Sequence, residues 1–364
     1  MRIGINCFED VEIRSIIASR GRIGNCDVTG QKNVLIYDTL AEDSPADLAV
    51  LLSEILDVYT PESELPSDFP PICLAYIEEV LFSDWSIFNL SVDKIKQVVI
   101  EVCKSIYAED SLVFKEKVGL ERLCDSDFLR RNCIMKESSW ERFMSSIKNI
   151  NRFHSNHINL ELLQKLFDSP SLQLLISKKS VIYYRARISG EKVYSQSEMG
   201  PPPYRLATAG RANSQGISCL YLASDIMTTF HEIRARDLDY VSVGEFVPNK
   251  ELKLVDLSNL HKISPFSAGT FGYEWFAINM NILKKISDEI AKPLRRQDSE
   301  LDYLPAQYIS DFIKSLGYDG ICYRSTLNVQ GLNYAIFNYK KFDCINVKQY
   351  HITSLSYCAD PAIG

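Results

Sequence analysis

The chain has 364 residues, of which 46% are hydrophobic, and a formal net charge of −7. Its length is sufficient for two or three compact units. No run approaches the roughly 20 consecutive apolar residues that a membrane-spanning helix needs. Charged residues appear too early for a signal peptide, so we expect a cytoplasmic protein. The acidic balance excludes a global basic field for nucleic acid. Ten cysteines without a secretory signal indicate reduced thiols.

The first two regions differ in pattern. Residues 1–41 predict a small N-terminal module with a helix near Glu9–Ser19, a glycine-flanked turn and the strand Val34–Tyr37. Residues 42–175 predict a helical region, because apolar residues recur there at i, i+3 and i+4. The expected helices are Ala46–Val58, Ile72–Phe82, Val92–Tyr107 and Ser139–Ile150. A proline-rich connector separates the first two of them.

Residues 176–364 form the third predicted region, with the boundary expected at residues 170–180. Short β-branched and aromatic runs predict strands: VIYYRARI, CLYLA, VSVGEF, LKLVDL, GICY and YAIF. Two helices interrupt them, Asp225–Arg236 and Leu304–Leu316. Strands with sparse helices predict an α+β domain with a mostly antiparallel sheet.

The strand VIYYRARI carries the first candidate site residues. Because side chains alternate along a strand, Arg185 and Arg187 face one side while Tyr184 and Ala186 face the other. Two guanidinium groups on one face could bind phosphate through paired hydrogen bonds. The alternative is an exposed strand with solvated charges.

A glycine-framed loop follows, AGRANSQG, which displays Arg211 and Asn213. Such a loop can bring backbone donors and a cation close to a ligand. The alternative is an ordinary surface loop. Which of the two applies is not decided by the loop sequence.

The helix after CLYLA carries Glu232. Its neighbours at i−4 and i−3, Thr228 and Thr229, are small and leave room for a ligand beside the carboxylate. The alternative is a solvated glutamate that pairs with Arg236 at i+4, which contributes a few tenths of a kcal/mol, roughly.

The order of these features resembles the RES domain, a family named for its Arg, Glu and Ser residues. Tyr-Arg-x-Arg, glycine-Arg-x-Asn, Leu-Tyr-Leu-Ala and a helix with Glu occur in that order. The stretch LPAQYISDFIKSLGYDGICYRSTLNVQGLNYAIF looks like the closing helix, strand and serine segment. The resemblance covers roughly Tyr183 to Asn338. It implies an ADP-ribosyltransferase-like fold that binds NAD⁺ and breaks its nicotinamide–ribose bond by hydrolysis or phosphorolysis.

Family members act as toxins of toxin–antitoxin pairs, and a few are described as ADP-ribosylating a protein. The resemblance assigns the site residue by residue. The catalytic residues it implies are Glu232, Arg185, Tyr221 and Ser325. The NAD⁺-binding residues it implies are Arg185, Arg187, Arg211, Asn213, Tyr221 and Gln307. Gln307 stands where shorter members place a serine at the start of the closing helix.

These residue types suit the chemistry. A carboxylate beside the ribose, here Glu232, stabilises the oxocarbenium-like charge that develops as nicotinamide leaves. Arg185 and Arg211 can hold the pyrophosphate, and Tyr221 can stack on nicotinamide or bind a ribose hydroxyl. NAD⁺ is then a substrate, and neither a cofactor nor a metal ion is required.

The opening INCFEDVEIRSIIASRGRIGNCDVTGQKNV resembles the small module that precedes RES domains in some proteins, joined to a helical part of HEPN type. Relatives of that module carry two Cys-x-x-Cys pairs, a spacing that suits zinc. This chain keeps Cys7 and Cys26, whereas Gly4 and Thr29 occupy the partner positions. We therefore expect two buried thiols in place of a zinc site.

Arg152 and His157 have the Arg-x4-His spacing of ribonuclease HEPN domains. The preferred interpretation is a helical scaffold, with these residues at a helix end.

The leading hypothesis is an NAD⁺ glycohydrolase or phosphorylase that acts as a toxin. The alternatives are a mono-ADP-ribosyltransferase, or an interaction or RNase module. Expected partners are NAD⁺ and an antitoxin or regulatory protein. We expect neither a membrane nor a nucleic acid as a partner. Whether the chain forms a homo-oligomer is left open by the sequence.

Overall fold

The computed structural model describes residues 1–41, 47–179, 181–258, 260–267, 269, 271–292, 299–328 and 330–355. Ala46 and Ser180, which belong to predicted elements or boundaries, lie outside this set. The chain divides into two compact units. Unit 1 comprises Met1–Ser138, Asn156–Lys165 and His261–Lys284, and unit 2 comprises Ser139–Ser155, Leu166–Leu260 and Lys285–Gly364.

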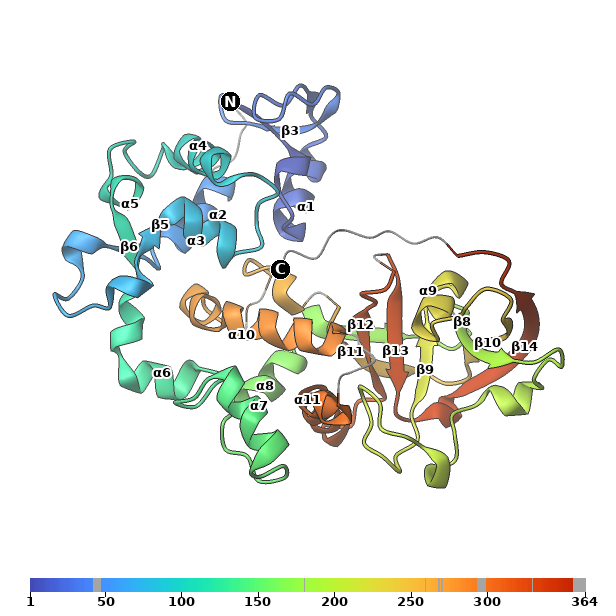
Figure 1. Cartoon of the computed structure of the whole chain (residues 1–364). Helices are drawn as coiled ribbons and strands as arrows, with labels where there is room; N and C mark the ends of the chain where they lie inside the picture. Colours follow the sequence, from blue (N-terminus) through green and yellow to red (C-terminus); the bar gives the residue numbers. More distant parts are fainter. Residues whose placement is uncertain are drawn as a thin grey trace. The chain divides into compact units, whose positions relative to one another are not determined.

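Unit 1 contains two small antiparallel sheets and most of the helices (Figure 1). One sheet has the order β1-β3-β2, with β1 at Arg2–Gly4, β2 at Ile23–Gly24 and β3 at Val34–Asp38. The other has the order β4-β6-β5, with β4 at Thr60–Pro61, β5 at Ala75–Tyr76 and β6 at Lys117–Gly119. The helices are α1 (Val11–Arg20), α2 (Asp47–Leu56), α3 (Ile77–Ser83), α4 (Val92–Cys103), α5 (Leu112–Lys115) and α6 (Ser126–Asn132).

Of the elements predicted in this region, α1, β3, α2 and α4 are confirmed, although α4 ends at Cys103 and not at Tyr107. The helix expected from Ile72 begins only at Ile77, because Pro70 and Pro71 precede it and a 3-10 turn and the strand β5 come first. The Glu79 carboxylate accepts the backbone N–H of Tyr76 at 3.0 Å, which fixes the helix start there.

Unit 2 is built on one eight-stranded sheet with the order β14-β10-β8-β9-β13-β12-β11-β7. All neighbours are antiparallel except β11 and β12, which are parallel. The strands are β7 (Gln173–Ile176), β8 (Tyr183–Ser189), β9 (Leu220–Ala223), β10 (Tyr240–Pro248), β11 (Leu252–Asp256), β12 (Gly320–Arg324), β13 (Leu332–Ile336) and β14 (Phe342–His351). The α+β class with a mostly antiparallel C-terminal sheet is thus confirmed.

Helices α7 (Trp140–Asn149), α9 (Ile226–Glu232) and α11 (Leu304–Ser315) belong to unit 2. Helix α9 packs on β8 and β9, and α11 packs on β12 and α7 (Figure 1). Residues of α8 (Leu160–Phe167) and α10 (Tyr273–Ala291) are divided between the two units. No helix among the described residues is long and apolar enough to cross a membrane.

The two faces of the large sheet pack against different cores, because side chains alternate along each strand. Tyr183 joins a core with Leu220, Leu222 and Tyr334. Ala186 joins the other, with Val241 and Val243, against which α9 residues pack. The predicted alternation along β8 is therefore confirmed, and it places Arg185 on the same side as Tyr183.

Two strands of the large sheet, β7 and β14, were not predicted, and neither were the short strands β1, β2, β4, β5 and β6 of unit 1. β7 is a short apolar run at the sheet edge, which the helical pattern of the preceding residues obscured. β14 lies at the other edge and reads FDCINVKQYH, in which polar residues occupy both faces. The two boundaries between the three predicted regions stay predictions; the two units group residues 1–138 together and place 261–284 with them.

Candidate active site

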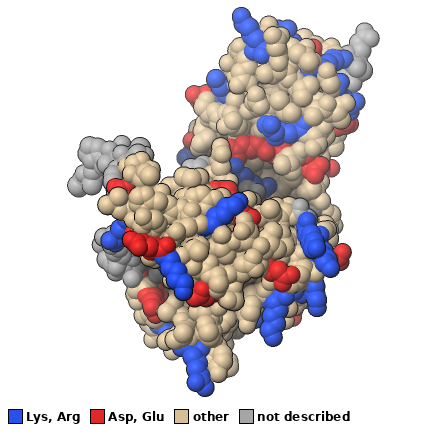
Figure 2. All heavy atoms as spheres, turned by 90° about the vertical axis from the view of Figure 1, so that its right-hand side faces the viewer, with Lys and Arg blue, Asp and Glu red and all other residues tan. Residues whose placement is uncertain are grey.

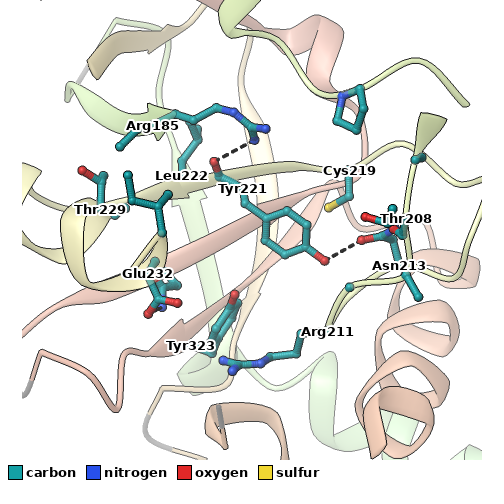
Figure 3. A pocket seen from close by; sticks show the side chains of 18 of the residues that line it. Arg185, Thr208, Arg211, Asn213, Cys219, Tyr221, Leu222, Thr229, Glu232 and Tyr323 are labelled. Carbon is teal, nitrogen blue, oxygen red and sulfur yellow. Dashed lines mark hydrogen bonds between the residues drawn. The ribbon is translucent and has the colours of Figure 1, made fainter. Parts of the chain in front are cut away.

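Unit 2 contains a cavity of about 380 Å³ at the end of the sheet where β8, β9, β12 and β13 meet α9. Figure 3 shows the side chains of Arg185, Tyr221 and Glu232 around the same space. The other polar or aromatic side chains that line it are Tyr184, Thr208, Arg211, Asn213, Thr229, Tyr303, Tyr323 and Asn333. Such a volume lies within the range of small-molecule sites.

Arg185 enters this cavity from β8. Its Nη1 donates to the backbone oxygen of Tyr221 at 3.3 Å, whereas its buried Nε has no hydrogen-bond partner. Burial, together with the like charge of Arg187, lowers the pKa of Arg185 to about 10, so the guanidinium is still charged at neutral pH. A buried cation with an unpaired N–H is costly unless an anion compensates it. Arg185 is thus suited to an anionic ligand.

Arg211 comes from the loop before β9 and lies over the Tyr323 ring, with its guanidinium carbon 5.0 Å from the ring centre. Its Nη2 donates to the backbone oxygen of Lys292 at 2.8 Å, and its buried Nε has no hydrogen-bond partner. The ring and the carbonyl hold the guanidinium in place. The cavity therefore has two cations with one unpaired Nε–H each.

Tyr221 and Asn213 lock the glycine-framed loop. The Tyr221 hydroxyl donates to Asn213 Oδ1 at 2.6 Å and accepts the Ala212 N–H at 2.9 Å. Asn213 Nδ2 donates to the backbone oxygens of Thr208, Ser214 and Ile217. Burial raises the pKa of Tyr221 well above its usual value, so its hydroxyl stays a donor. Both residues line the cavity. The polar atoms of the Asn213 side chain form hydrogen bonds to Tyr221 and to the backbone of the loop.

Replacing Tyr221 by phenylalanine should destabilise the protein by about 1–3 kcal/mol, because Asn213 Oδ1 and the Ala212 N–H lose a buried partner. The Tm should fall by about 2–4 °C for each kcal/mol. Differential scanning fluorimetry measures this. The control is Tyr204→Phe, since that ring is 63% exposed. Equal Tm values for the two variants would contradict the assignment.

Gln307 supports the same loop from behind. It is buried in α11, and its Nε2 donates to the backbone oxygens of Gly210 at 2.8 Å and Asn213 at 3.0 Å. Its Oε1 accepts from Ser214 Oγ at 3.3 Å. It is not among the residues that line the cavity, and its contacts hold the loop. The assignment of Gln307 to NAD⁺ binding stays a prediction.

Arg187, the other arginine of β8, shares a strand face with Arg185 but lies outside the cavity lining, and its assignment to NAD⁺ binding stays a prediction. Its Nη1 donates to the backbone oxygen of Glu198, and its guanidinium lies 4.7 Å from the centre of the Tyr194 ring. Arg187 lies two residues further along β8 than Arg185. There its guanidinium donates a hydrogen bond to the 3-10 turn Gln196–Met199. The arginines therefore do not form one paired site.

Glu232 is the last residue of α9. The predicted continuation to Arg236 is wrong, because Arg234 adopts a left-handed conformation with φ 51° and ends the helix. The carboxylate does not use Arg236 as its partner. Its Oε1 accepts hydrogen bonds from Ser325 Oγ and Asn333 Nδ2, both at 2.7 Å. The structure thus brings together the Arg, Glu and Ser residues of the predicted set, with Ser325 behind the carboxylate.

The turn that carries Ser325 is also tied to the start of α9. Asp225 caps the helix by accepting from Thr228 N at 2.8 Å and Thr228 Oγ1 at 2.6 Å. Thr228 Oγ1 in turn accepts from Asn328 Nδ2 at 2.8 Å. The turn after β12 is therefore bound to both ends of α9.

Gly331 lies where this turn contacts α9, and a Cβ there would be 2.1 Å from Thr228 Oγ1. Gly331→Ala should therefore destabilise the protein by about 1–3 kcal/mol, and should lower activity because the turn carries Ser325. Thermal unfolding and the turnover assay described below measure both effects. Gly190→Ala is the matched control, since its Cβ would meet nothing within 4 Å. A Gly331→Ala protein as stable as this control would contradict the packing.

Several cavity residues were missed from the sequence, among them Asn333 and Tyr323. Asn333 and Tyr323 face each other across β13 and β12, and both line the cavity. Neither strand shows a polar pattern that marks them, because their neighbours are buried apolar residues. The only available signal was their place beside Ser325 in the closing segment.

In unit 1, Cys7 and Cys26 are both buried, as expected, and their Sγ atoms lie 3.6 Å apart. Burial raises the pKa of Cys7 to about 12. Cys26 Sγ accepts the backbone N–H of Gly4 at 3.1 Å, at one of the positions where relatives carry a cysteine. Within the described ranges, no group of three or more His, Cys, Asp or Glu side chains could hold a metal ion.

Arg152 and His157 each have a local partner. Arg152 Nε donates to the backbone oxygen of Ile147 at 3.5 Å, and His157 Nδ1 shares a hydrogen bond with Ser138 Oγ at 2.7 Å. Both follow the end of α7 along the chain, and the scaffold interpretation stays a prediction. RNase activity stays an alternative that neither contact supports.

Figure 2 shows one face of the molecule, on which Lys and Arg side chains are interspersed with Asp and Glu. The residues described on this face form no continuous basic area.

Residues 182–358 match the family model of the RES domain. No curated protein is significantly similar in sequence. Among solved structures, a chain of the crystal structure of the M. tuberculosis MbcT–MbcA toxin–antitoxin complex matches with 13% identity and a TM-score of 0.29. The match covers 52% of this chain and 91% of that chain.

Proposed function

Because residues 182–358 form a RES domain, we propose that the cavity in unit 2 binds NAD⁺ and cleaves its nicotinamide–ribose bond. The proposal is supported by the opposite charges that lie together in one cavity. The cavity is lined by the Glu232 carboxylate, which accepts a hydrogen bond from Ser325. It is also lined by Arg185 and Arg211, each of which has an unpaired Nε–H group. NAD⁺ offers complementary groups, a pyrophosphate and a ribose that becomes cationic.

In the proposed reaction, the bond between C1 of the ribose and the nicotinamide nitrogen breaks, and its electron pair leaves with nicotinamide. The ribose gains oxocarbenium character, which the Glu232 carboxylate stabilises. An acceptor oxygen then bonds to C1. When the acceptor is water, one of its protons passes to solvent and ADP-ribose forms; when it is phosphate dianion, ADP-ribose phosphate forms without proton release.

The arginines contribute binding and orientation. Arg185 and Arg211 lie on different elements, β8 and the loop before β9, so that together they can hold the pyrophosphate from two directions. The locked loop keeps Arg211 in place without ligand, which lowers the entropic cost of binding. The protein thus supplies position and charge, and NAD⁺ supplies the bond that breaks.

The test is to incubate the purified chain with NAD⁺, with and without phosphate, and to quantify nicotinamide, ADP-ribose and ADP-ribose phosphate by chromatography. Nicotinamide release above the spontaneous rate supports the proposal. A product that changes on addition of phosphate identifies phosphorolysis, and an unchanged product identifies hydrolysis. Nicotinamide that appears with label on the protein, when labelled NAD⁺ is used, would identify a transferase.

We further propose that the chain acts as a toxin that drains NAD⁺ and is restrained by an antitoxin protein. The support is the RES domain, whose resemblance implies this role. Induced expression in a bacterial host should arrest growth and lower the NAD⁺ pool, whereas Glu232→Gln should do neither. Growth arrest by both forms would contradict toxicity through NAD⁺ loss.

A further inference from the structure

Within the described part of the chain, the hydrogen bonds to the Glu232 carboxylate all reach one of its two oxygens. Ser325 Oγ and Asn333 Nδ2 each lie 2.7 Å from Oε1. No described residue donates to Oε2. The two oxygens of the carboxylate are therefore unequal before any ligand binds.

The two donors are themselves fixed. Ser325 follows β12 directly, and its Oγ also accepts the backbone N–H groups of Leu327 at 3.3 Å and Asn328 at 3.2 Å. With these acceptor sites taken, its proton is directed at Glu232. Asn333 lies within β13, paired with Ala223 on one side and Tyr323 on the other. Both donor side chains are only 4% exposed.

We propose that Asn333, together with Ser325, is a positioning residue that holds Oε1 of Glu232 and reserves Oε2 for the substrate. This inference rests on the proposed function. A carboxylate at a helix end can otherwise rotate about its terminal torsion, for which the preference is broad. Two donors on one oxygen fix that torsion. Oε2 then has a constant place from which to accept a ribose hydroxyl and to face the developing charge.

Asn333 is the informative residue, because it also lines the cavity and could instead touch NAD⁺ directly. Loss of a positioning contact lowers kcat and leaves KM nearly unchanged, because it acts on an interaction made in the transition state. Loss of a substrate contact raises KM. We therefore expect Asn333→Ala to lower kcat by about 10- to 100-fold, the range for a hydrogen bond to a charged group, with KM within about twofold.

A second signature comes from the isosteric variant Asn333→Asp. At neutral pH it places two carboxylates where a donor and an acceptor now meet at 2.7 Å, so neither can donate. On acidification one shared proton restores a donor, and the pair again carries a single negative charge. The kcat of Asn333→Asp relative to the unchanged chain should therefore rise about fivefold or more from about pH 8 to about pH 5.5. The same ratio for Asn333→Ala should stay constant.

The other groups that face this cavity are common to all the variants, so their titration cancels in the ratio. The charged or titratable ones are Tyr184, Arg185, Arg211, Cys219, Tyr221, Tyr303 and Tyr323. The buried ones among them stay protonated over this pH range: burial raises the pKa of Cys219 to about 12 and raises the pKa values of Tyr221 and Tyr323.

The experiment measures nicotinamide release by the full chain, its Asn333→Ala and Asn333→Asp variants, and Asn338→Ala as a matched control. Asn338 is exposed and its side chain makes no cap hydrogen bond. Ser325→Thr keeps a hydroxyl and should retain more activity than Ser325→Ala. Thermal unfolding checks each variant; if Asn333→Ala fails to fold, Asn333→Asp, which keeps the side-chain volume, carries the test.

A kcat of Asn333→Ala within about twofold of the unchanged chain overturns the inference. So does a loss that appears in KM alone, or an Asn333→Asp ratio that does not change with pH. These outcomes differ from failure of the proposed function, in which the unchanged chain itself releases no nicotinamide.

Discussion

Replacing Glu232 by glutamine should lower kcat for nicotinamide release by about 100- to 1,000-fold, because the charge that faces the oxocarbenium-like ribose is lost. Glutamine keeps the length and shape of the side chain. Its Oε1 can still accept from Ser325 and Asn333, as the carboxylate does at 2.7 Å. The variant should therefore fold with nearly the same Tm, and the loss should reflect charge alone.

Nicotinamide release at saturating NAD⁺ measures this effect, with thermal unfolding in parallel. The matched control is Glu191→Gln, an exposed glutamate of unit 2 outside the cavity, which should leave the rate unchanged. A Glu232→Gln variant that turns over NAD⁺ at the original rate would remove the carboxylate from the mechanism. The assignment would then have to move to another part of the cavity.

Replacing Arg185 by alanine should weaken NAD⁺ binding by about 10- to 100-fold, the loss of a hydrogen bond between charged groups. The guanidinium now has a free, buried Nε–H and one contact at 3.3 Å to the backbone of Tyr221. An anionic ligand therefore gains a donor that the protein leaves unpaired. Arg185→Lys should recover part of the affinity, since it restores charge without the planar fork.

Binding is best measured by calorimetry in the Glu232→Gln background, in which NAD⁺ is not consumed during the titration. Arg236→Ala is the control, because that arginine is exposed and lies beyond the end of α9. If the Arg185→Ala and control proteins bind NAD⁺ with equal affinity, Arg185 only stabilises β9, through its hydrogen bond to the backbone of Tyr221. A change in affinity for ADP-ribose equal to that for NAD⁺ would locate the contact on the pyrophosphate side.

Local patterns in the sequence were sufficient for much of the fold. Alternation along VIYYRARI predicted β8 and the side that Arg185 faces, because a strand has a period of two whatever it packs against. Apolar spacing predicted α2, α4, α7 and α11 within a few residues. The edge strands β7 and β14 were missed because an edge needs little apolar pattern.

The sequence by itself determined which residues were candidates: Arg185, Arg187, Arg211, Asn213, Tyr221, Glu232, Gln307 and Ser325. The order of motifs selected them, although each motif alone had an ordinary structural explanation. Only the tertiary structure decided how they divide the work. It showed that Arg187 points to a neighbouring turn and that Gln307 supports a loop.

The end of α9 shows why the remainder was not predictable. The hydrogen bonds that hold Glu232 join residues 93 and 101 positions apart in the chain. They arise because β13 pairs with β12 on one side and with β9 on the other. Helix α9 follows β9 directly in the chain and therefore begins at the same end of the sheet. Helical and strand periodicity describe only neighbours within a turn or a pleat. The partner of a carboxylate across the sheet depends on register and strand order, which folding of the whole unit sets.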